Sequence, residues 1–164
     1  MMNKLILTAL AVLGAAHLAS ADTLVVNKTG SDGAYTTIQA AISAAEAGDT
    51  IFVKAGVYET GSTTDGFSTP MENRVYVNKS VKILGESREQ TIIKGARATT
   101  GVDSYGLGCG SNAVRCIGIN ADNVVISNLT VTGGATHNSS DGNDKEENNG
   151  GGVYALNGKT GIVI

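Results

Sequence analysis

The sequence is poor in the residues that usually fill a large core. Aromatic residues make up 4% of the 164 residues and tryptophan is absent, so a core has to be built from Val, Ile, Leu and Ala. A single proline beside 22 glycines excludes a collagen-like or proline-rich chain and suits many tight turns between short strands. The formal net charge is −3 and no basic patch is evident, which disfavours nucleic acid as a partner.

Residues 1–21 have the pattern of a secretory signal peptide. Lys4 precedes an apolar stretch at residues 5–18, and residues 19–21 (ASA) form a small-residue cleavage site. The apolar stretch is too short to span a bilayer comfortably, although a retained membrane anchor is the alternative. We therefore expect one mature domain at residues 22–164, with no membrane span after cleavage, in a secreted, periplasmic or cell-surface protein.

The chain has two cysteines, Cys109 and Cys116. An oxidising compartment favours their pairing, and the intervening GSNAVR segment can turn the chain back. We expect a local disulfide, the alternative being two buried thiols. A zinc site is poorly supported, because His137 is the only other soft ligand in the mature chain.

One amphipathic helix is predicted at residues 37–47. Thr36 is the expected N-cap, Gln39 completes a capping box with it, and Gly48 is the expected C-terminal glycine. The apolar residues of this segment recur at helical spacing and form one narrow stripe: Ile38, Ala41, Ile42 and Ala45.

The other predicted elements are strands of three to five residues, rich in β-branched side chains and bounded by Gly, Asn, Asp or Ser. They recur with connections of very different lengths, which is typical of a solenoid with regular coils and irregular loops. We predict an all-β fold, a parallel β-helix whose first open edge is capped by the helix; a β-sandwich is the alternative. The chain ends in an apolar GIVI strand, so we expect further coils to follow. The predicted strands are residues 23–26, 50–53, 74–77, 81–84, 91–94, 115–119, 123–126, 128–131, 153–156 and 161–164.

Two polar excursions, residues 60–73 and 136–152, interrupt the strand pattern. In solenoids such insertions gather on one face and often shape a binding groove; solvated loops without a ligand are the alternative. The second excursion contains the densest group of carboxylates, which are weak candidates for binding Ca²⁺ because their spacing matches no calcium loop. These carboxylates are Asp141, Asp144, Glu146 and Glu147.

Basic residues are concentrated between positions 79 and 97, where they could steer an anionic sugar. Lys82 and Lys94 alternate with apolar residues, so outward-facing, solvated positions on strands are the favoured interpretation. We identify no catalytic motif, and no cofactor is evident; Ca²⁺ is a weak candidate.

Four segments carry a resemblance to a known family: TIQAA at residues 37–41, GDTIFV at 48–53, GVYE at 56–59 and KSVKILGE at 79–86. Together they resemble the amino-terminal region of the pectin-lyase-like superfamily, which includes pectinesterases and bacterial surface β-helix proteins. The resemblance implies a right-handed parallel β-helix. It carries over no catalytic residue, because the aspartates and the arginine of pectinesterases lie on later coils within motifs that this chain does not show.

Two functions remain open at this point. The first is a secreted or cell-surface β-helix scaffold that is structural, adhesive or carbohydrate-binding. The alternative is the amino-terminal part of a polysaccharide-active enzyme, such as a pectate lyase, a pectinesterase or a glycoside hydrolase. The expected partner is a polysaccharide or another cell-surface ligand.

Overall fold

The computed structural model describes residues 20–66, 70–101, 108–137 and 150–164, and these form short strands with one α-helix. Most strands are rich in β-branched residues, which favour extended backbone because their χ1 freedom is restricted. The elements are β1 (Thr23–Val26), the 3₁₀ turn Ser31–Gly33, α1 (Ile38–Ala44), β2 (Thr50–Val53), β3 (Gly56–Tyr58), β4 (Thr63–Thr64), β5 (Glu72–Val77), β6 (Lys82–Gly85), β7 (Thr91–Lys94), β8 (Val114–Ile119), β9 (Val125–Ser127), β10 (Thr130–Thr132) and β11 (Val153–Ala155).

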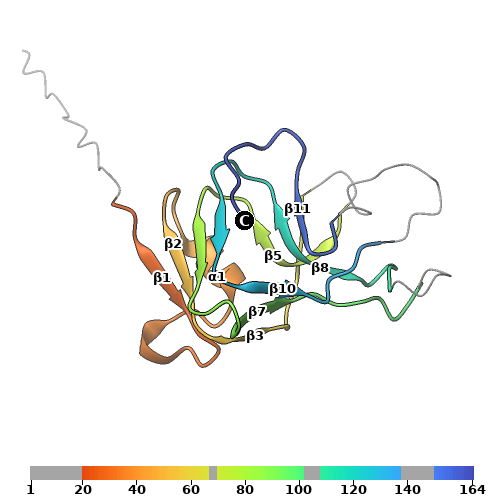
Figure 1. Cartoon of the computed structure of the whole chain (residues 1–164), viewed down its shortest axis with the longest axis horizontal. Helices are drawn as coiled ribbons and strands as arrows, with labels where there is room; N and C mark the ends of the chain where they lie inside the picture. Colours follow the sequence, from red (N-terminus) through yellow and green to blue (C-terminus); the bar gives the residue numbers. More distant parts are fainter. Residues whose placement is uncertain (1–19, 67–69, 102–107, 138–149) are drawn as a thin grey trace, which may run out of the picture.

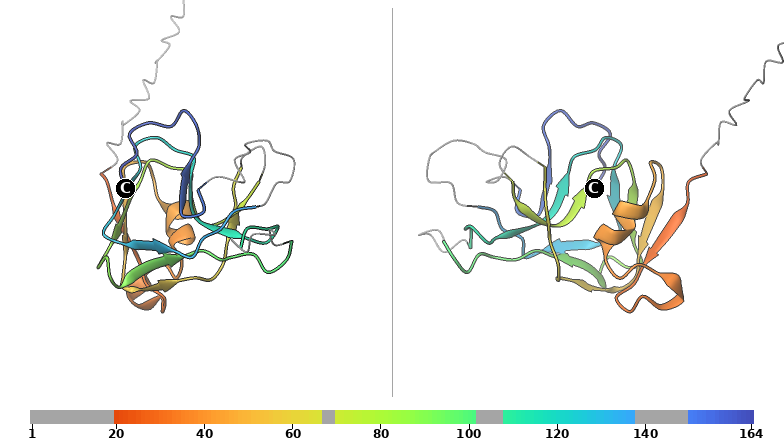
Figure 2. Two further views of the ribbon diagram at one scale, coloured as in Figure 1. Left: turned by 45° about the vertical axis from the view of Figure 1, so that its right-hand side comes forward. Right: turned by 180° about the vertical axis from the view of Figure 1, so that it is seen from behind.

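The strands form three sheets, which we name A (β1-β2-β6-β9), B (β3-β7-β10) and C (β4-β5-β8-β11). All neighbouring strands run parallel except the short antiparallel pair β4–β5. From β2 onward the chain visits A, B and C in turn and then returns to A, so each full turn adds one strand to each sheet, with β4 as an additional short strand in sheet C (Figures 1 and 2). This is the coil arrangement of a parallel β-helix.

The core consists of columns of similar side chains, one residue from each coil. In sheet A, Ile51, Ile83 and Ile126 lie in register on consecutive strands and are buried. Sheet B aligns Tyr58, Ile93 and Val131, and sheet C aligns Val75, Ile117 and Val153. Because parallel strands bring equivalent positions directly over one another, the repeated aliphatic residue becomes a continuous core, as the composition predicted.

The corner between sheets A and B explains one asparagine and one glycine of the sequence. Asn128 has a left-handed backbone (φ 55°), which asparagine tolerates better than most residues, and its Nδ2 donates to the carbonyl of Gly85 on the preceding coil at 2.8 Å. A Cβ atom at Gly85 would lie 2.1 Å from the carbonyl oxygen of Asn128. The corner therefore stacks this closely only with glycine at position 85.

Helix α1 is shorter than predicted, and its capping differs from the prediction at both ends. Thr37, and not Thr36, is the N-cap, with its side chain accepting a hydrogen bond from the Ala40 N–H at 3.1 Å. Gln39 forms no capping box, because its amide is engaged with strand β5. The predicted apolar stripe is confirmed, since all four of its residues are buried.

The C-terminal end of α1 is set by side chains from outside the helix. The helix ends at Ala44 and not next to Gly48, which lies in the following turn. Lys79 Nζ donates to the carbonyls of Ser43 and Ala45, each at 2.7 Å, and the Asp49 carboxylate accepts from the Glu46 N–H at 2.8 Å. These partners satisfy the backbone groups that a further helical turn would have used, so the helix stops early.

Gln39 covers part of the edge of sheet C. Its Oε1 accepts from the Tyr76 N–H at 2.8 Å and its Nε2 donates to the Tyr76 carbonyl at 3.2 Å. The side-chain amide thereby forms the two bonds that the backbone of a neighbouring strand would form with β5. Because β4 pairs with the first part of β5, these contacts leave less unpaired backbone at this edge. The role of α1 as a lid over the first coil stays a prediction.

Two strands were not predicted, and one predicted strand is a single bridge. β3 is three residues long and begins at Gly56, whereas β4 is only two residues long. At the C-terminal end, the segment 161–164 contributes only the parallel bridge between Val163 and Val125.

We predict that Gln39→Leu lowers the free energy of unfolding by about 1–2 kcal/mol, because the backbone N–H and carbonyl of Tyr76 lose their hydrogen bonds to Gln39. Urea denaturation followed by circular dichroism measures the change. Ser43→Ala, on the exposed side of the same helix, is the control and should change stability by less than about 0.5 kcal/mol. An equal effect of the two substitutions would contradict the role assigned to Gln39.

A second prediction concerns acid stability. Hydrogen bonds from the backbone N–H groups of Glu46 and Asp22 lower the pKa of Asp49 below its usual 3.8. A carboxylate whose pKa is lower in the folded state than in the unfolded state stabilises the fold at pH values above its unfolded pKa. This stabilisation is lost as the pH falls through its folded pKa. Asp49→Asn should therefore be less stable than the unmodified protein at pH 7, with the difference narrowing below pH 3.8. A pH-independent difference in urea midpoints would argue against this role.

Candidate functional site

Apart from residues 27–49, which join β1 to β2 and contain α1, the long connections of the solenoid leave the stack at one corner. Connections from sheet A to sheet B are short, whereas those from β3 to β5, β7 to β8 and β10 to β11 span residues 59–71, 95–113 and 133–152, the first of them including the short strand β4 of sheet C. Both predicted excursions belong to this set, and the sequence analysis missed the one at 95–113. The described parts of the three connections lie on the same side of the molecule, at the right of Figure 1. We call them, with strands β5, β8 and β11, the loop face.

A small apolar cluster joins the three connections. It consists of Met71, Ala98, Ala113 and Ala135, all buried, and it is separate from the main core. The backbone of Ala98 also donates to Gly108 at 2.7 Å, and Gly110 donates to Thr136 at 3.0 Å. The described parts of the connections therefore pack against one another as a layer.

A buried ion pair fixes the first connection to sheet C. Arg115 on β8 and Asp65 have completely buried side chains, with 3.2 Å between Nη1 and Oδ2. Asn73 on β5 accepts from the same guanidinium at 3.2 Å and donates to Asp65 at 2.8 Å. The guanidinium also lies over the ring of Tyr154 on β11, 4.8 Å from its centre. A buried charge requires such partners. This network therefore fixes the position of the first connection relative to sheet C.

The structure contains no disulfide between Cys109 and Cys116, and that prediction is corrected here. The buried Cys116 points into the corner between sheets B and C, where its Sγ accepts from the Gly95 N–H at 3.2 Å and donates to the Thr132 carbonyl at 3.1 Å. Burial raises the pKa of this thiol. Cys109 Sγ instead lies 3.6 Å from Thr136 Oγ1. The turn between the two cysteines thus directs their side chains to different partners.

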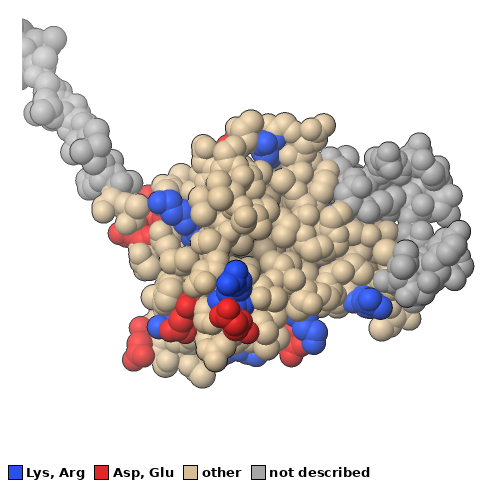
Figure 3. Space-filling model, viewed as in Figure 1, with Lys and Arg blue, Asp and Glu red and all other residues tan. Residues whose placement is uncertain are grey.

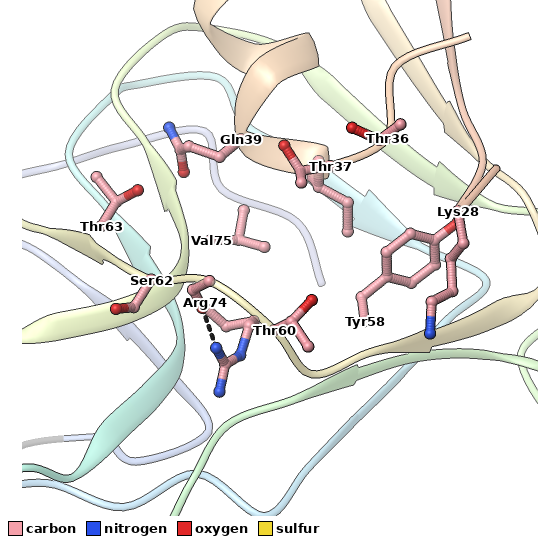
Figure 4. Close-up of a pocket in the computed structure, with 12 residues that line it drawn as sticks. Lys28, Thr36, Thr37, Gln39, Tyr58, Thr60, Ser62, Thr63, Arg74 and Val75 are labelled. Carbon is pink, nitrogen blue, oxygen red and sulfur yellow. Dashed lines mark hydrogen bonds between the residues drawn. The ribbon is translucent and has the colours of Figure 1, made fainter. Parts of the chain in front are cut away.

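A pocket of about 360 Å³ lies between the start of α1, the first connection and β5 (Figure 4). Ile38, Tyr58 and Val75 supply its apolar lining. Hydroxyl groups and two basic side chains supply the polar lining: Thr36, Thr37, Thr60, Ser62, Thr63, Lys28 and Arg74. This mixture of an apolar lining with a few placed polar groups is characteristic of small-molecule sites.

The charge around this pocket is positive. Lys28 Nζ donates to the Val57 carbonyl at 2.8 Å, and Arg74 donates to the carbonyls of Lys94 and Gly61. The neighbouring carboxylate, Glu59, pairs with Lys94 at 2.9 Å. That hydrogen bond, the charge of Lys94 and the charges of Lys28 and Arg74 lower the pKa of Glu59.

On the face of the molecule that Figure 3 shows, charged side chains in the lower part mostly neighbour opposite charges. Beside the grey residues at the right of that view, the visible charge is basic. Of the basic residues singled out in the sequence, Lys82 is exposed on sheet A, as predicted. Lys79 instead binds carbonyls at the end of α1.

The carboxylates proposed as weak Ca²⁺ ligands, Asp141, Asp144, Glu146 and Glu147, lie outside the described residues. Within the described ranges, no three His, Cys, Asp or Glu residues are grouped so that they could hold a metal ion.

The described part of the chain contains no helix with the length and apolar character needed to cross a membrane. The segment predicted as a signal peptide is described only from residue 20 onward.

Comparison with solved structures identifies pectin methylesterases as similar in fold. A pectin methylesterase in complex with a hexasaccharide matches with 25% identity and a TM-score of 0.51, over 84% of this chain and 40% of that one. Pectin methylesterase PemA from Erwinia chrysanthemi matches with 25% identity, the same coverage and a TM-score of 0.52. The chain thus spans 40% of the length of these structures. Comparisons with protein-family models and with curated proteins find no match.

The buried ion pair leads to a prediction about stability. Asp65→Ala should lower the free energy of unfolding by about 3–5 kcal/mol, because it removes the carboxylate that pairs with a buried guanidinium. In the double variant with Arg115→Met, the loss should be smaller than the sum of the single losses, since no buried charge is then left without its partner.

Chemical denaturation of the four proteins in this cycle gives the coupling energy. Lys94→Met, which breaks the half-exposed pair with Glu59, is the control and should have a much smaller effect. Strictly additive losses at positions 65 and 115 would show that the two residues do not act as a pair.

Proposed function

Because the chain has the pectin-lyase-like, right-handed parallel β-helix fold found in pectin methylesterases, we propose that it binds an acidic polysaccharide along the loop face. The observation that carries this proposal is the stacking of three long connections at one corner, joined by their own apolar cluster. Consecutive coils repeat at the spacing of strands in a sheet, about 4.8 Å. The connections therefore form a strip along the solenoid axis, a shape that suits an extended polymer better than a compact ligand.

The charge near this corner supports an acidic ligand. Three cations, Lys28, Arg74 and Lys94, lie near the carboxylate of Glu59. A polymer with repeating carboxylates would be attracted to such a region, and salt would weaken that attraction. The first 21 residues support a location outside the cytoplasm, where polysaccharides of this kind are accessible, because they have the pattern of a signal peptide.

A second candidate is catalytic, with this chain as the amino-terminal coils of a polysaccharide-active enzyme. It is favoured by the similarity to pectin methylesterases at 25% identity. A structural or adhesive scaffold, in contrast, needs no affinity for acidic polysaccharides. The binding protein, the enzyme and the scaffold therefore give different results when polysaccharide binding and product release are measured together.

Affinity electrophoresis tests the proposed function. The protein should be retarded in gels that contain polygalacturonate, less so at raised ionic strength, and not in gels that contain dextran. Asn112→Ala should reduce the retardation, because Asn112 Oδ1 holds the backbone N–H groups of Thr99 and Thr100 at 2.9 and 3.1 Å in the second connection. Asn78→Ala, at an exposed position in the short turn after β5, is the matched control.

The outcomes separate the candidates. Retardation without methanol release from methylated pectin supports the binding protein, whereas methanol release supports the esterase. Equal mobility in all gels would refute polysaccharide binding and leave the scaffold.

A further inference from the structure

The pocket beside α1 borders the loop face and extends from it to the start of the helix. Four parts of the chain contribute to it: the turn after β1, the start of α1, the first connection and β5. Its volume of about 360 Å³ is at the small end of the range for ligand sites. It therefore suits a single small ligand, whereas the loop face suits a polymer.

The lining of the pocket defines the chemistry of that ligand. The ring of Tyr58 is largely buried and its hydroxyl group donates to the Lys54 carbonyl at 2.9 Å, so the ring is fixed in place. Hydroxyl groups of Thr36, Thr37 and Thr60 surround it (Figure 4). A fixed aromatic ring among hydroxyl groups matches the apolar faces and the hydroxyl groups of a sugar ring.

Two cations add a requirement for negative charge. In Figure 4, Lys28 and Arg74 lie on either side of Tyr58 and Thr60. In the described part of the chain, both donate only to backbone carbonyls, and neither forms an ion pair with a carboxylate. Arg74 uses Nε and Nη1 in these bonds, which leaves donors of the guanidinium for a ligand. Arginine stays charged at any physiological pH.

Glu59 does not neutralise these cations. Its carboxylate is held by Lys94 at 2.9 Å, and its lowered pKa keeps it ionised near neutral pH. The group of Lys28, Arg74, Lys94 and Glu59 therefore retains net positive charge. A ligand carboxylate would supply the missing negative charge through charge-assisted hydrogen bonds, which are the stronger kind.

We infer that this pocket binds a single uronic-acid unit, with the sugar ring beside Tyr58 and the carboxylate between Lys28 and Arg74. The inference goes beyond the proposed function, because it assigns a pocket for one sugar unit, although this pocket shares the first connection and β5 with the loop face. It also needs no covalent step and no cofactor.

Titration of the ¹⁵N-labelled protein with galacturonate, followed by NMR, tests the inference. Saturable shifts should appear at residues 36–39 and 58–63, and galactose, which lacks the carboxylate, should bind about tenfold more weakly or worse. Lys28→Gln should weaken galacturonate binding to a similar degree, and Arg74→Gln by at least as much. Lys82→Gln removes the same charge from an exposed position on sheet A and should leave binding unchanged.

Three results would overturn the inference: no saturable shifts with galacturonate, equal binding of galactose, or unchanged binding by Lys28→Gln. Equal affinity for acetate would also overturn it, because the sugar ring would then contribute nothing. Arg74 has backbone partners, and its substitution can perturb the fold, whereas Lys28 is exposed. The galacturonate affinity of the Lys28→Gln variant is therefore the decisive measurement for the inference. Retardation by polygalacturonate, measured on the same variants, shows separately whether the proposed function holds.

Discussion

The vertical stacking of aliphatic side chains is the constraint on which the rest of the molecule depends. Each coil is too short to form a core by itself, and it becomes stable only when its inward residues lie on those of the neighbouring coil. The column Ile51, Ile83 and Ile126 shows how strictly this is kept in sheet A. Because the inward positions are fixed in this way, variation in length is confined to the connections, and the long ones gather at the corner between sheets B and C.

The same constraint explains why the candidate sites lie where they do. A loop that leaves a regular stack must satisfy its own backbone and bury its own apolar residues. The cluster around Met71 and the pair between Asp65 and Arg115 do this for the loop face. The pocket arises differently, where α1 and the first connection meet β5, and Gln39 fixes the helix to that strand.

Much of the fold could be predicted from the sequence, because strand-forming residues and turn residues alternate clearly along it. The strands Thr23–Val26, Thr50–Val53 and Thr91–Lys94 have the predicted bounds. Some predictions that were wrong are local, such as the N-cap of α1, which is Thr37 and not Thr36, and others concern interactions between distant segments. Nothing near Gln39 in the sequence indicates that its amide would pair with Tyr76, and nothing near Cys116 indicates that Gly95 and Thr132 would occupy its sulfur. The pocket could not be predicted either, since Lys28 and Arg74, which are distant in the sequence, line one pocket only because of the coiling of the chain.

The most direct test of the central claim is to map where an oligogalacturonate contacts the protein, by NMR shift changes or by a structure of the complex. Contacts along the described connections, at residues 59–66, 95–101 and 108–113, are the predicted result. Contacts confined to the outer face of sheet A, around Phe52 and Leu84, or no contacts with the folded protein, would contradict the account.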